Sequence, residues 1–356
     1  MSKKEYINIE EIGEFGLIEE IKKLFPDKKR QETVVGIGDD AAVLNMNDQF
    51  LTLLSTDNLN EEVHFDLFYT PLKHLGFKSV SVSASDICAM NGEPIGVTVG
   101  IALDSRFTVP MVKEFYEGVR IACNKYGIDL IGGDTTGSYK GLFINTSIIG
   151  KVEKDRVTYR SGAGPGDLIC VTGDLGGAYV GLLIMQREKE VHMEAPQATI
   201  KLEGYEYLIE RLLKPEARLD VVRMLRELDV VPSAMIDISD GLASDLLHIC
   251  AASNVGCVIY EEKFPIDPIV YRTALLEFNL NPTTVFLSGG EDYELLFTIP
   301  ERYGDLFENH PDITIIGKIL PKEEGTYMIS KSGNKYELTA QGWDAFRKYL
   351  RENSNP

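Results

Sequence analysis

The pattern of apolar and polar residues along the first half of the chain predicts a mixture of helices and strands. Residues 5–25 carry apolar side chains at helical spacing among acidic ones, which indicates an amphipathic helix ending near Pro26. Two apolar runs flank the polar loop Asn45–Asp48, so residues 36–57 are expected to form a β-hairpin whose second strand closes at Asp57. Residues 71–91 predict a helix rich in small residues. Further elements are expected as strands over 95–103, 128–131 and 142–152 and as a helix over 109–126.

In this first half, the run 128–131 is expected to be a buried strand that breaks into the Gly-rich segment 132–137. The second half begins with a predicted strand over 168–172, a Gly-rich turn and a helix over 178–185. Helices over 205–213 and 217–228 come next, then a strand that ends at Asp237 and leads into another helix. Residues 285–292 are expected to form a Gly-Gly turn between strands. A charged, Gly-rich stretch near 153–166 separates two predicted domains, 1–153 and 154–356.

Composition limits the classes of protein to which the chain can belong. It has 356 residues, 36 of them basic and 55 acidic, for a formal net charge of −19. Such an acidic chain repels nucleic acid, and it repels nucleotides as well unless metal ions neutralise the contact. No apolar run is long enough for a membrane span and the start lacks a signal-peptide core, so a cytoplasmic protein without membrane contact is expected. The five cysteines form no CxxC pair, which favours reduced, buried thiols.

Acidic residues beside glycines and hydroxyls are the candidate functional groups. They recur at the ends of predicted strands and in the small-residue helix, as Asp40, Asp57, Asp86, Asp134, Asp237 and Asp240, with Ser55, Thr56 and Ser239 beside them. Like charges brought together need cations between them, and oxygen ligands suit Mg²⁺, which commonly accompanies phosphates. Each aspartate taken alone is also typical of a turn or a helix cap. No P-loop, GxGxxG, GxSxG or HExxH motif is present, so a bound nucleotide would be held by metals and loop backbone.

Nine segments, in this order along nearly the whole chain, resemble the thiamine-monophosphate kinase family: GEFGLI (13–18), GIGDDAAVL (36–44), STDNLNEEVHF (55–65), SDICAM (85–90), EFYEGV (114–119), GGDTT (132–136), RSGAGPGD (160–167), DISDGLASDLLHI (237–249) and SGGEDYEL (288–295). The resemblance implies a two-domain α/β fold of the aminoimidazole ribonucleotide synthetase (PurM-like) type. In that fold residues 1–153 bind ATP and Mg²⁺ and pair their sheet across a homodimer, and residues 154–356 form a second PurM-like α/β domain. It also implies ATP-dependent conversion of thiamine monophosphate to thiamine diphosphate, the last step in making that cofactor.

Site residues follow from the same resemblance. Asp57, Asp134 and Asp237 are the implied catalytic residues, and the implied magnesium ligands are Asp40, Ser55, Thr56, Asp57, Asp86, Asp134, Asp237 and Asp240. ATP contacts fall on Tyr116, Gly133, Asp134, Arg160 and Ser239, and contacts to thiamine monophosphate fall on His64, Glu291 and Trp343. His64 is otherwise a loop histidine, and Tyr116 and Trp343 are otherwise core residues. The frequent Arg-His-Leu-Arg-Pro of the family appears here as Arg211-Leu-Leu-Lys-Pro215, so Arg211, Lys214 and Arg218 receive no role.

The implied chemistry agrees with the residue types. The acceptor is a phosphate oxygen that is ionised near neutral pH, so direct in-line transfer of the γ-phosphoryl group needs several Mg²⁺ ions but no strong general base. Two alternatives stay open at this point. One is another ATP-dependent enzyme of the superfamily, of the aminoimidazole ribonucleotide synthetase or selenophosphate synthetase type. The other is a protein that binds nucleotide or metal without catalysis.

Overall fold

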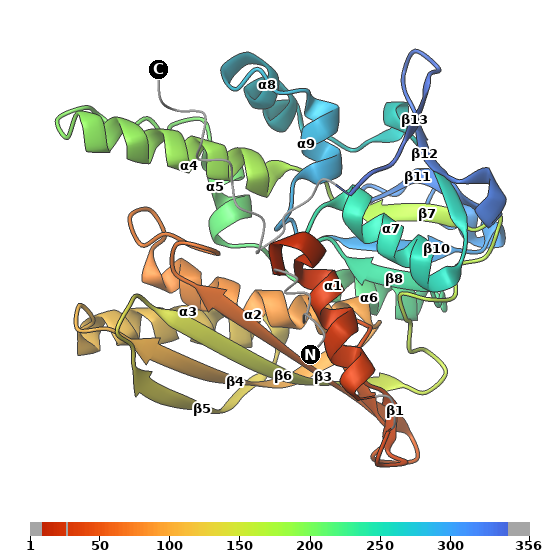
Figure 1. Ribbon diagram of the computed structural model, residues 1–356, viewed down its shortest axis with the longest axis horizontal. Coiled ribbons are helices and arrows are strands. Elements are labelled where there is room, and N and C mark those ends of the chain that lie inside the picture. Colours follow the sequence, from red (N-terminus) through yellow and green to blue (C-terminus); the bar gives the residue numbers. More distant parts are fainter. Residues whose placement is uncertain (1–8, 26–27, 341–356) are drawn as a thin grey trace, which may run out of the picture.

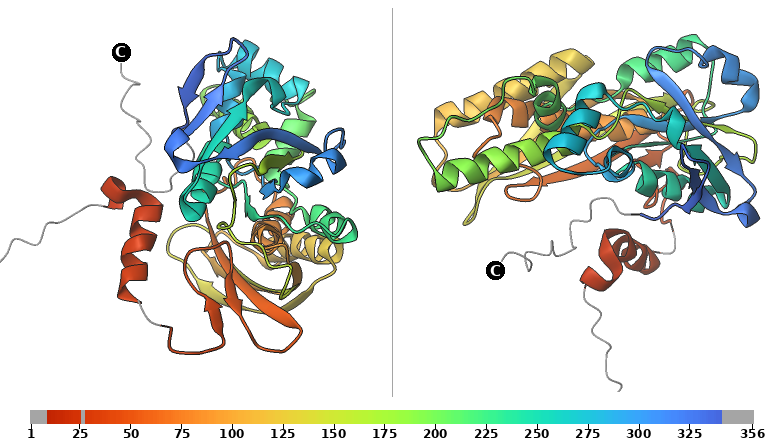
Figure 2. Two further views of the ribbon diagram at one scale, coloured as in Figure 1. Left: turned by 90° about the vertical axis from the view of Figure 1, so that its right-hand side faces the viewer. Right: turned by 90° about the horizontal axis from the view of Figure 1, so that it is seen from above.

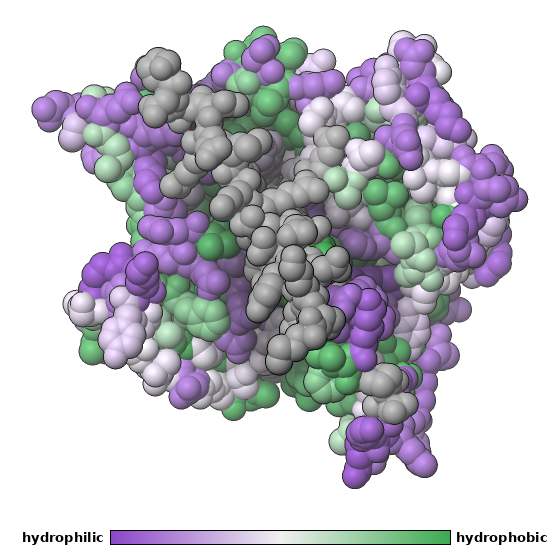
Figure 3. Space-filling view, viewed as in Figure 1, coloured by the Kyte–Doolittle hydropathy of each residue, from purple (hydrophilic) through white to green (hydrophobic). Residues whose placement is uncertain are grey.

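The computed structural model describes residues 9–25 and 28–340 and contains two β-sheets with helices packed against them (Figure 1). Helix α1 (Ile9–Leu24) lies outside both sheet layers, as the turned views in Figure 2 show. It contacts the rest of the protein through Phe15, whose ring centroid lies 4.0 Å from that of His248. The face seen in Figure 3 is mostly hydrophilic with separate apolar patches. No helix among the described residues is long and apolar enough to cross a membrane.

The N-terminal sheet has the order β1-β2-β3-β6-β4-β5 among the described residues. Its strands are β1 (Thr33–Val35), β2 (Ala42–Leu44), β3 (Phe50–Asn60), β4 (Glu93–Leu103), β5 (Asp129–Gly137) and β6 (Phe143–Glu153). β2 and β3 pair antiparallel with Ala42 opposite Leu54, which confirms the predicted hairpin. The expected close of the second strand at Asp57 is wrong, because β3 continues in register with β6 to Asn60. Ser55, Thr56 and Asp57 therefore lie in the middle of a strand.

Helices α2 (Leu72–Ala89) and α3 (Val109–Tyr126) cover one face of this sheet (Figure 1). Two glycines allow their backbones to touch. A Cβ on Gly76 would lie 1.9 Å from the carbonyl oxygen of Phe115, and one on Gly118 would lie 1.9 Å from that of Lys73. The small residues of α2 are therefore required by close packing, which fixes the helix firmly between α3 and the sheet.

The C-terminal sheet has the order β13-β12-β9-β11-β7-β10-β8 in the described part of the chain. Its strands are β7 (Leu168–Thr172), β8 (Ala234–Asp237), β9 (Gly256–Tyr260), β10 (Leu295–Ile299), β11 (Ile313–Leu320), β12 (Thr326–Ile329) and β13 (Lys335–Glu337). The accompanying helices are α4 (Gly177–Glu194), α5 (Glu206–Leu213), α6 (Leu219–Glu227), α7 (Leu242–Ser253), α8 (Pro268–Glu277) and α9 (Pro282–Ser288). The mixture of helices and strands agrees with the predicted α/β class.

Three local predictions are wrong. The run 128–131 does not end in a Gly-rich turn, because β5 continues through the glycines to Gly137. Nor is this strand buried: all nine of its residues are exposed, and among the described residues β5 is an edge strand that pairs with β4 alone. Residues 282–288 form helix α9, so the Gly-Gly turn lies between a helix and a strand. Asn281 caps this helix through a hydrogen bond from the Thr283 amide, and Pro282 occupies its first turn.

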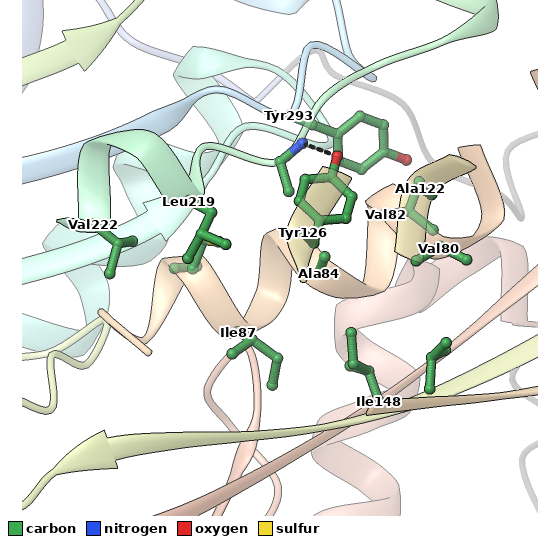
Figure 4. Close-up of a cluster of buried hydrophobic side chains, with 14 of the residues drawn as sticks. Val80, Val82, Ala84, Ile87, Ala122, Tyr126, Ile148, Leu219, Val222 and Tyr293 are labelled. Atoms are coloured by element: carbon green, nitrogen blue, oxygen red, sulfur yellow. Dashed lines mark hydrogen bonds between the residues drawn. The ribbon is translucent and has the colours of Figure 1, made fainter. Parts of the chain in front are cut away.

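One hydrophobic core joins the two halves of the chain. Figure 4 shows Leu219 and Val222 of α6 beside Ile87 of α2, and Tyr293 near Tyr126 of α3. The amide of Ala217 also donates a hydrogen bond to the Tyr126 hydroxyl at 2.9 Å. Because α2 packs against its own sheet and also against β8, side chains from both halves reach the same place.

Candidate active site

Three carboxylates from three separate elements meet where α2 packs against β8. Asp40 precedes β2, Asp86 lies near the end of α2 and Asp237 is the last residue of β8. Each has a carboxylate oxygen within 4.8 Å of the corresponding oxygens of the other two. Together these carboxylates are called the acid cluster below. The sequence placed all three among the magnesium ligands, and the structure brings them together.

Each acid of the cluster is oriented by a specific donor. The Ser85 hydroxyl donates to Asp237 at 2.6 Å, the Ser55 hydroxyl donates to Asp86, and the Arg160 guanidinium donates to Asp40 at 2.7 Å. Asp57 on β3 accepts from the Ser83 hydroxyl of α2 at 2.6 Å, which places a fourth acid at the rim of the cluster. The serines at 83 and 85 thus hold acids from opposite halves of the protein.

Negative charge exceeds positive charge in this cluster. Burial, followed by the charge of Asp40, raises the pKa of Asp237 to about 7. Burial raises the pKa of Asp86 well above its ordinary value, and the charges of Asp57, Asp237 and Asp40 raise it further. Oδ2 of Asp40 is buried and has no hydrogen-bond partner among the described residues. An all-oxygen donor set with excess charge and an unpaired oxygen fits a hard divalent cation such as Mg²⁺.

Strand β3 carries three of the other predicted ligands, and it does not place them all on the same face of the sheet. Side chains alternate along it, so Ser55 and Asp57 face α2 whereas Thr56 faces the opposite side of the sheet. There the Thr56 hydroxyl donates to the carbonyl oxygen of Thr146 at 3.0 Å and accepts from the Asn145 amide at 3.1 Å. The side chain of Thr56 is therefore not brought to the acid cluster.

The predicted ATP contacts are also divided. Arg160 touches the acid cluster, and its backbone amide donates to Asp39 at 2.8 Å. Ser239 lies just beyond Asp237, where its carbonyl oxygen accepts from the Glu291 amide at 2.7 Å, and Asp240 follows it. Tyr116 lies on α3, half-buried against the N-terminal core. Gly133 and Asp134 lie on the exposed edge strand β5. From β3 to β5 there are three strand spacings, about 14 Å, so one chain does not bring Asp134 to Asp57.

The predicted acceptor contacts come together around a lysine that the sequence analysis missed. The Lys78 ammonium donates to Oε1 of Glu291 at 2.9 Å and to the carbonyl oxygen of His64 at 3.3 Å. Burial lowers the pKa of His64, and its Nδ1 accepts a hydrogen bond from the Asn60 amide. The signal for Lys78 was a lysine immediately before the run of small and apolar residues 79–85. Trp343 lies outside the described residues.

Arg211 and Arg218 occupy a second buried charge network, which the sequence left without a role. Both guanidinium groups bind the carboxylate of Glu294, Arg211 at 2.8 Å. The two arginines outweigh the effect of burial, so the pKa of Glu294 is lowered. Next to it lies a cavity of about 670 Å³ whose lining includes Arg211, Lys214 and Arg218. In this network two guanidinium groups converge on one buried carboxylate, whereas three carboxylates converge in the acid cluster.

Comparison with known proteins identifies the family. The AIR synthase related protein family matches the chain in two parts, its N-terminal domain over residues 38–152 and its C-terminal domain over 164–329. The chain is 36% identical to the thiamine-monophosphate kinase of Aquifex aeolicus over 340 residues, which cover 96% of this chain and 100% of that protein. It is 32% identical to the Bacillus subtilis enzyme, covering 88% and 94% of the two chains. The chain belongs to the thiamine-monophosphate kinase family.

Solved structures agree with this assignment. The structure of AaThiL complexed with AMPPCP and TMP has a TM-score of 0.80 and 33% identity, covering 96% of this chain and 99% of that one. HypE structures at 18–21% identity share the fold alone. The predicted two-domain PurM-like fold is confirmed, and so is the prediction of a phosphotransferase. For this thiamine-monophosphate kinase family member, the acid cluster is the candidate phosphoryl-transfer site.

Proposed function

We propose that this chain transfers the γ-phosphoryl group of ATP to thiamine monophosphate and thereby completes the synthesis of thiamine diphosphate. An oxygen of the acceptor phosphate forms a bond to the γ-phosphorus while the bond to the β–γ bridging oxygen breaks, and ADP leaves with that electron pair. The observation that carries the proposal is the acid cluster, whose carboxylates lie within 4.8 Å of one another in a chain that belongs to this kinase family.

The chain's own residues fit this reaction. Asp40, Asp86 and Asp237, with Asp57 and Ser55 beside them, would hold Mg²⁺. When bound, the ions would neutralise the charge on the transferred phosphoryl group. Arg160 fixes Asp40 from the other side. The lowered pKa of His64 keeps its imidazole neutral near pH 7, in agreement with a reaction that needs no strong general base.

We also propose that the chain works as a homodimer in which Asp134 of one subunit completes the site of the other. Support comes from the exposed edge strand β5, which carries Asp134, and from exposed apolar residues nearby, Leu54, Ile95, Leu130 and Ile131. Mixing an Asp134→Asn chain with an Asp86→Asn chain tests this. If the site is shared, mixed dimers hold one intact site, and a random mixture regains about a quarter of wild-type activity. If each chain builds its own site, mixing restores none.

The decisive assay combines ATP, Mg²⁺ and thiamine monophosphate and measures thiamine diphosphate. We expect thiamine diphosphate and ADP in equal amounts, and no product when Mg²⁺ is removed. Formylglycinamidine ribonucleotide and selenide serve as competing acceptors, and turnover of either in place of thiamine monophosphate would assign a different superfamily activity. Direct transfer leaves no phosphate on the protein, so covalent radiolabel after incubation with ATP alone would contradict it.

A further inference from the structure

The ammonium of Lys78 is almost completely removed from solvent. Its side chain is 2% exposed, whereas the side chain of Glu291 keeps 25% of its surface exposed. A buried ammonium is costly unless a counter-charge and further hydrogen-bond acceptors surround it. Glu291 supplies the charge and the His64 carbonyl oxygen supplies a second acceptor. The pair therefore has a hidden positive end and an accessible negative end.

Glu291 is held in an unusual backbone conformation. Its φ of 64° lies in the left-handed region, which is uncommon for a residue with a side chain. The Glu291 amide donates to the carbonyl oxygen of Ser239 at 2.7 Å, so its backbone is tied to the loop that follows Asp237. Its side chain is tied to α2 through Lys78. Two contacts in different directions thus fix where this carboxylate points.

His64 is fixed by the same lysine. Its carbonyl oxygen accepts from Lys78, and its ring Nδ1 accepts from the Asn60 amide at 3.0 Å. His64 belongs to the N-terminal half and Glu291 to the C-terminal half, so Lys78 is the group that sets the distance between them. Lys78 also lies seven residues before Ser85, which places both on one face of α2. That helix face therefore holds Glu291 at one end and Asp237 at the other.

We infer that Lys78 is a positioning residue for the phosphoryl acceptor: it fixes the Glu291 carboxylate and the His64 loop so that both halves of the chain form one acceptor site. This inference rests on the proposed function. Thiamine monophosphate carries a cationic thiazolium ring, which a carboxylate complements. Lys78 itself does not touch the acceptor, because Glu291 and the His64 carbonyl lie around its ammonium.

The test compares Lys78→Met with Lys125→Met, a lysine on α3 whose ion pair with Glu216 lies away from this site. Methionine keeps the stem of the side chain as far as the ε carbon and removes the charged terminal nitrogen, and the partly exposed Glu291 can then be hydrated. For Lys78→Met we expect the KM for thiamine monophosphate to rise about tenfold, with kcat and the KM for ATP changed by less than about twofold. Lys125→Met leaves all three constants as in the wild type.

A second readout is independent of catalysis. Glu291 raises the pKa of His64 and Lys78 lowers it, so Lys78→Met is expected to raise the His64 pKa measured by NMR. Lys125→Met leaves that pKa unchanged. An unaltered KM for thiamine monophosphate in Lys78→Met, or equal increases in both KM values, would overturn the role of Lys78 while the wild type remains active. A wild-type chain that forms no thiamine diphosphate would overturn the proposed function itself, and this inference with it.

Discussion

The acid cluster and the Glu294 network are two groups of buried charges in the same molecule, and they are arranged in opposite ways. In the acid cluster, Asp40, Asp86 and Asp237 converge, and Arg160 bonds to Asp40. In the network, the guanidinium groups of Arg211 and Arg218 converge on Glu294, and Arg211 also pairs with Asp292 at 3.4 Å. Burial penalises the charged form in both places. The pKa of Asp86 is raised well above its ordinary value, however, whereas that of Glu294 is lowered.

The difference indicates what each group is for. Glu294 has its counter-charge within the chain and is ionised without any further partner, as expected of an acid that stabilises the fold. The acid cluster lacks enough counter-charge, so it is stable as a set of ionised groups only when cations are added. A raised pKa alone does not mark a metal site, because burial also raises the pKa of Asp292 in the network to about 7. What distinguishes the acid cluster is that three carboxylates converge within 4.8 Å.

The largest expected effect is on activity. Asp86→Asn removes one charge from the acid cluster with almost no change in shape. We expect formation of thiamine diphosphate to fall by about a thousandfold, because a ligand for the ions that neutralise the transferred group is lost. The thermal midpoint without Mg²⁺ should not fall, since repulsion in the cluster decreases. A clearly lower midpoint in EDTA would show that Asp86 supports the fold as Glu294 does.

The next effect is on stability. Glu294→Gln leaves Arg211 and Arg218 without their shared carboxylate, so the free energy of unfolding in urea should drop by about 3 kcal/mol or more. Asp86→Asn, measured in the same way without metal, is the matched control and should show no such loss. If the Glu294→Gln chain were as stable as the wild type, Glu294 would not stabilise the fold, and the acid cluster and the Glu294 network would not differ in this respect.

A smaller effect concerns pH. The pKa of Asp237 is about 7 in the folded chain and near 3.9 when unfolded, so between these values the folded chain holds a proton that the unfolded chain releases. The free energy of unfolding of the metal-free chain therefore falls as pH rises through this window. We expect a thermal midpoint about 5 °C lower at pH 8 than at pH 5 in EDTA, and a smaller difference with Mg²⁺. Asp237→Asn should reduce the EDTA difference; an unchanged slope would contradict this account.

The smallest effect is at the surface. Lys125 and Glu216 form an ion pair at 2.6 Å, and both side chains are more than 40% exposed. Lys125→Met should change the free energy of unfolding by less than about 1 kcal/mol, because water and salt screen such pairs. Urea unfolding at two salt concentrations would check this. If Lys125→Met lowered the free energy of unfolding as much as Glu294→Gln does, burial would not determine how much an ion pair contributes to stability.

The sequence predicted much of the site because its pattern encoded local geometry. Asp40 precedes the first strand of a hairpin and Asp237 ends a buried strand, so their neighbourhoods could be inferred from periodicity and glycine placement. The serine-rich helix around Asp86 indicated close packing, and the glycines of α2 and α3 account for it. The family resemblance then supplied the order of the pieces.

The features of the fold and site that the sequence did not predict mostly depend on contacts between distant segments. Lys78 and Glu291 are 213 residues apart, and no local pattern indicates that they pair. The apolar residues Leu130 and Ile131 suggested a buried strand, and the sequence did not show that β5 lies exposed at the edge of the sheet. Helix α9 was missed although Asn281 and Pro282 form a recognisable start, because the following Gly-Gly drew attention to a turn. The opposite orientation of Thr56 required the register of β3.

Helix α2 carries Lys78 and Asp86 eight residues apart, about 12 Å along its axis. With Gly76 and Gly118 locking it against α3, this interval cannot stretch. The helix therefore keeps Glu291, which Lys78 holds, at a constant separation from the acid cluster.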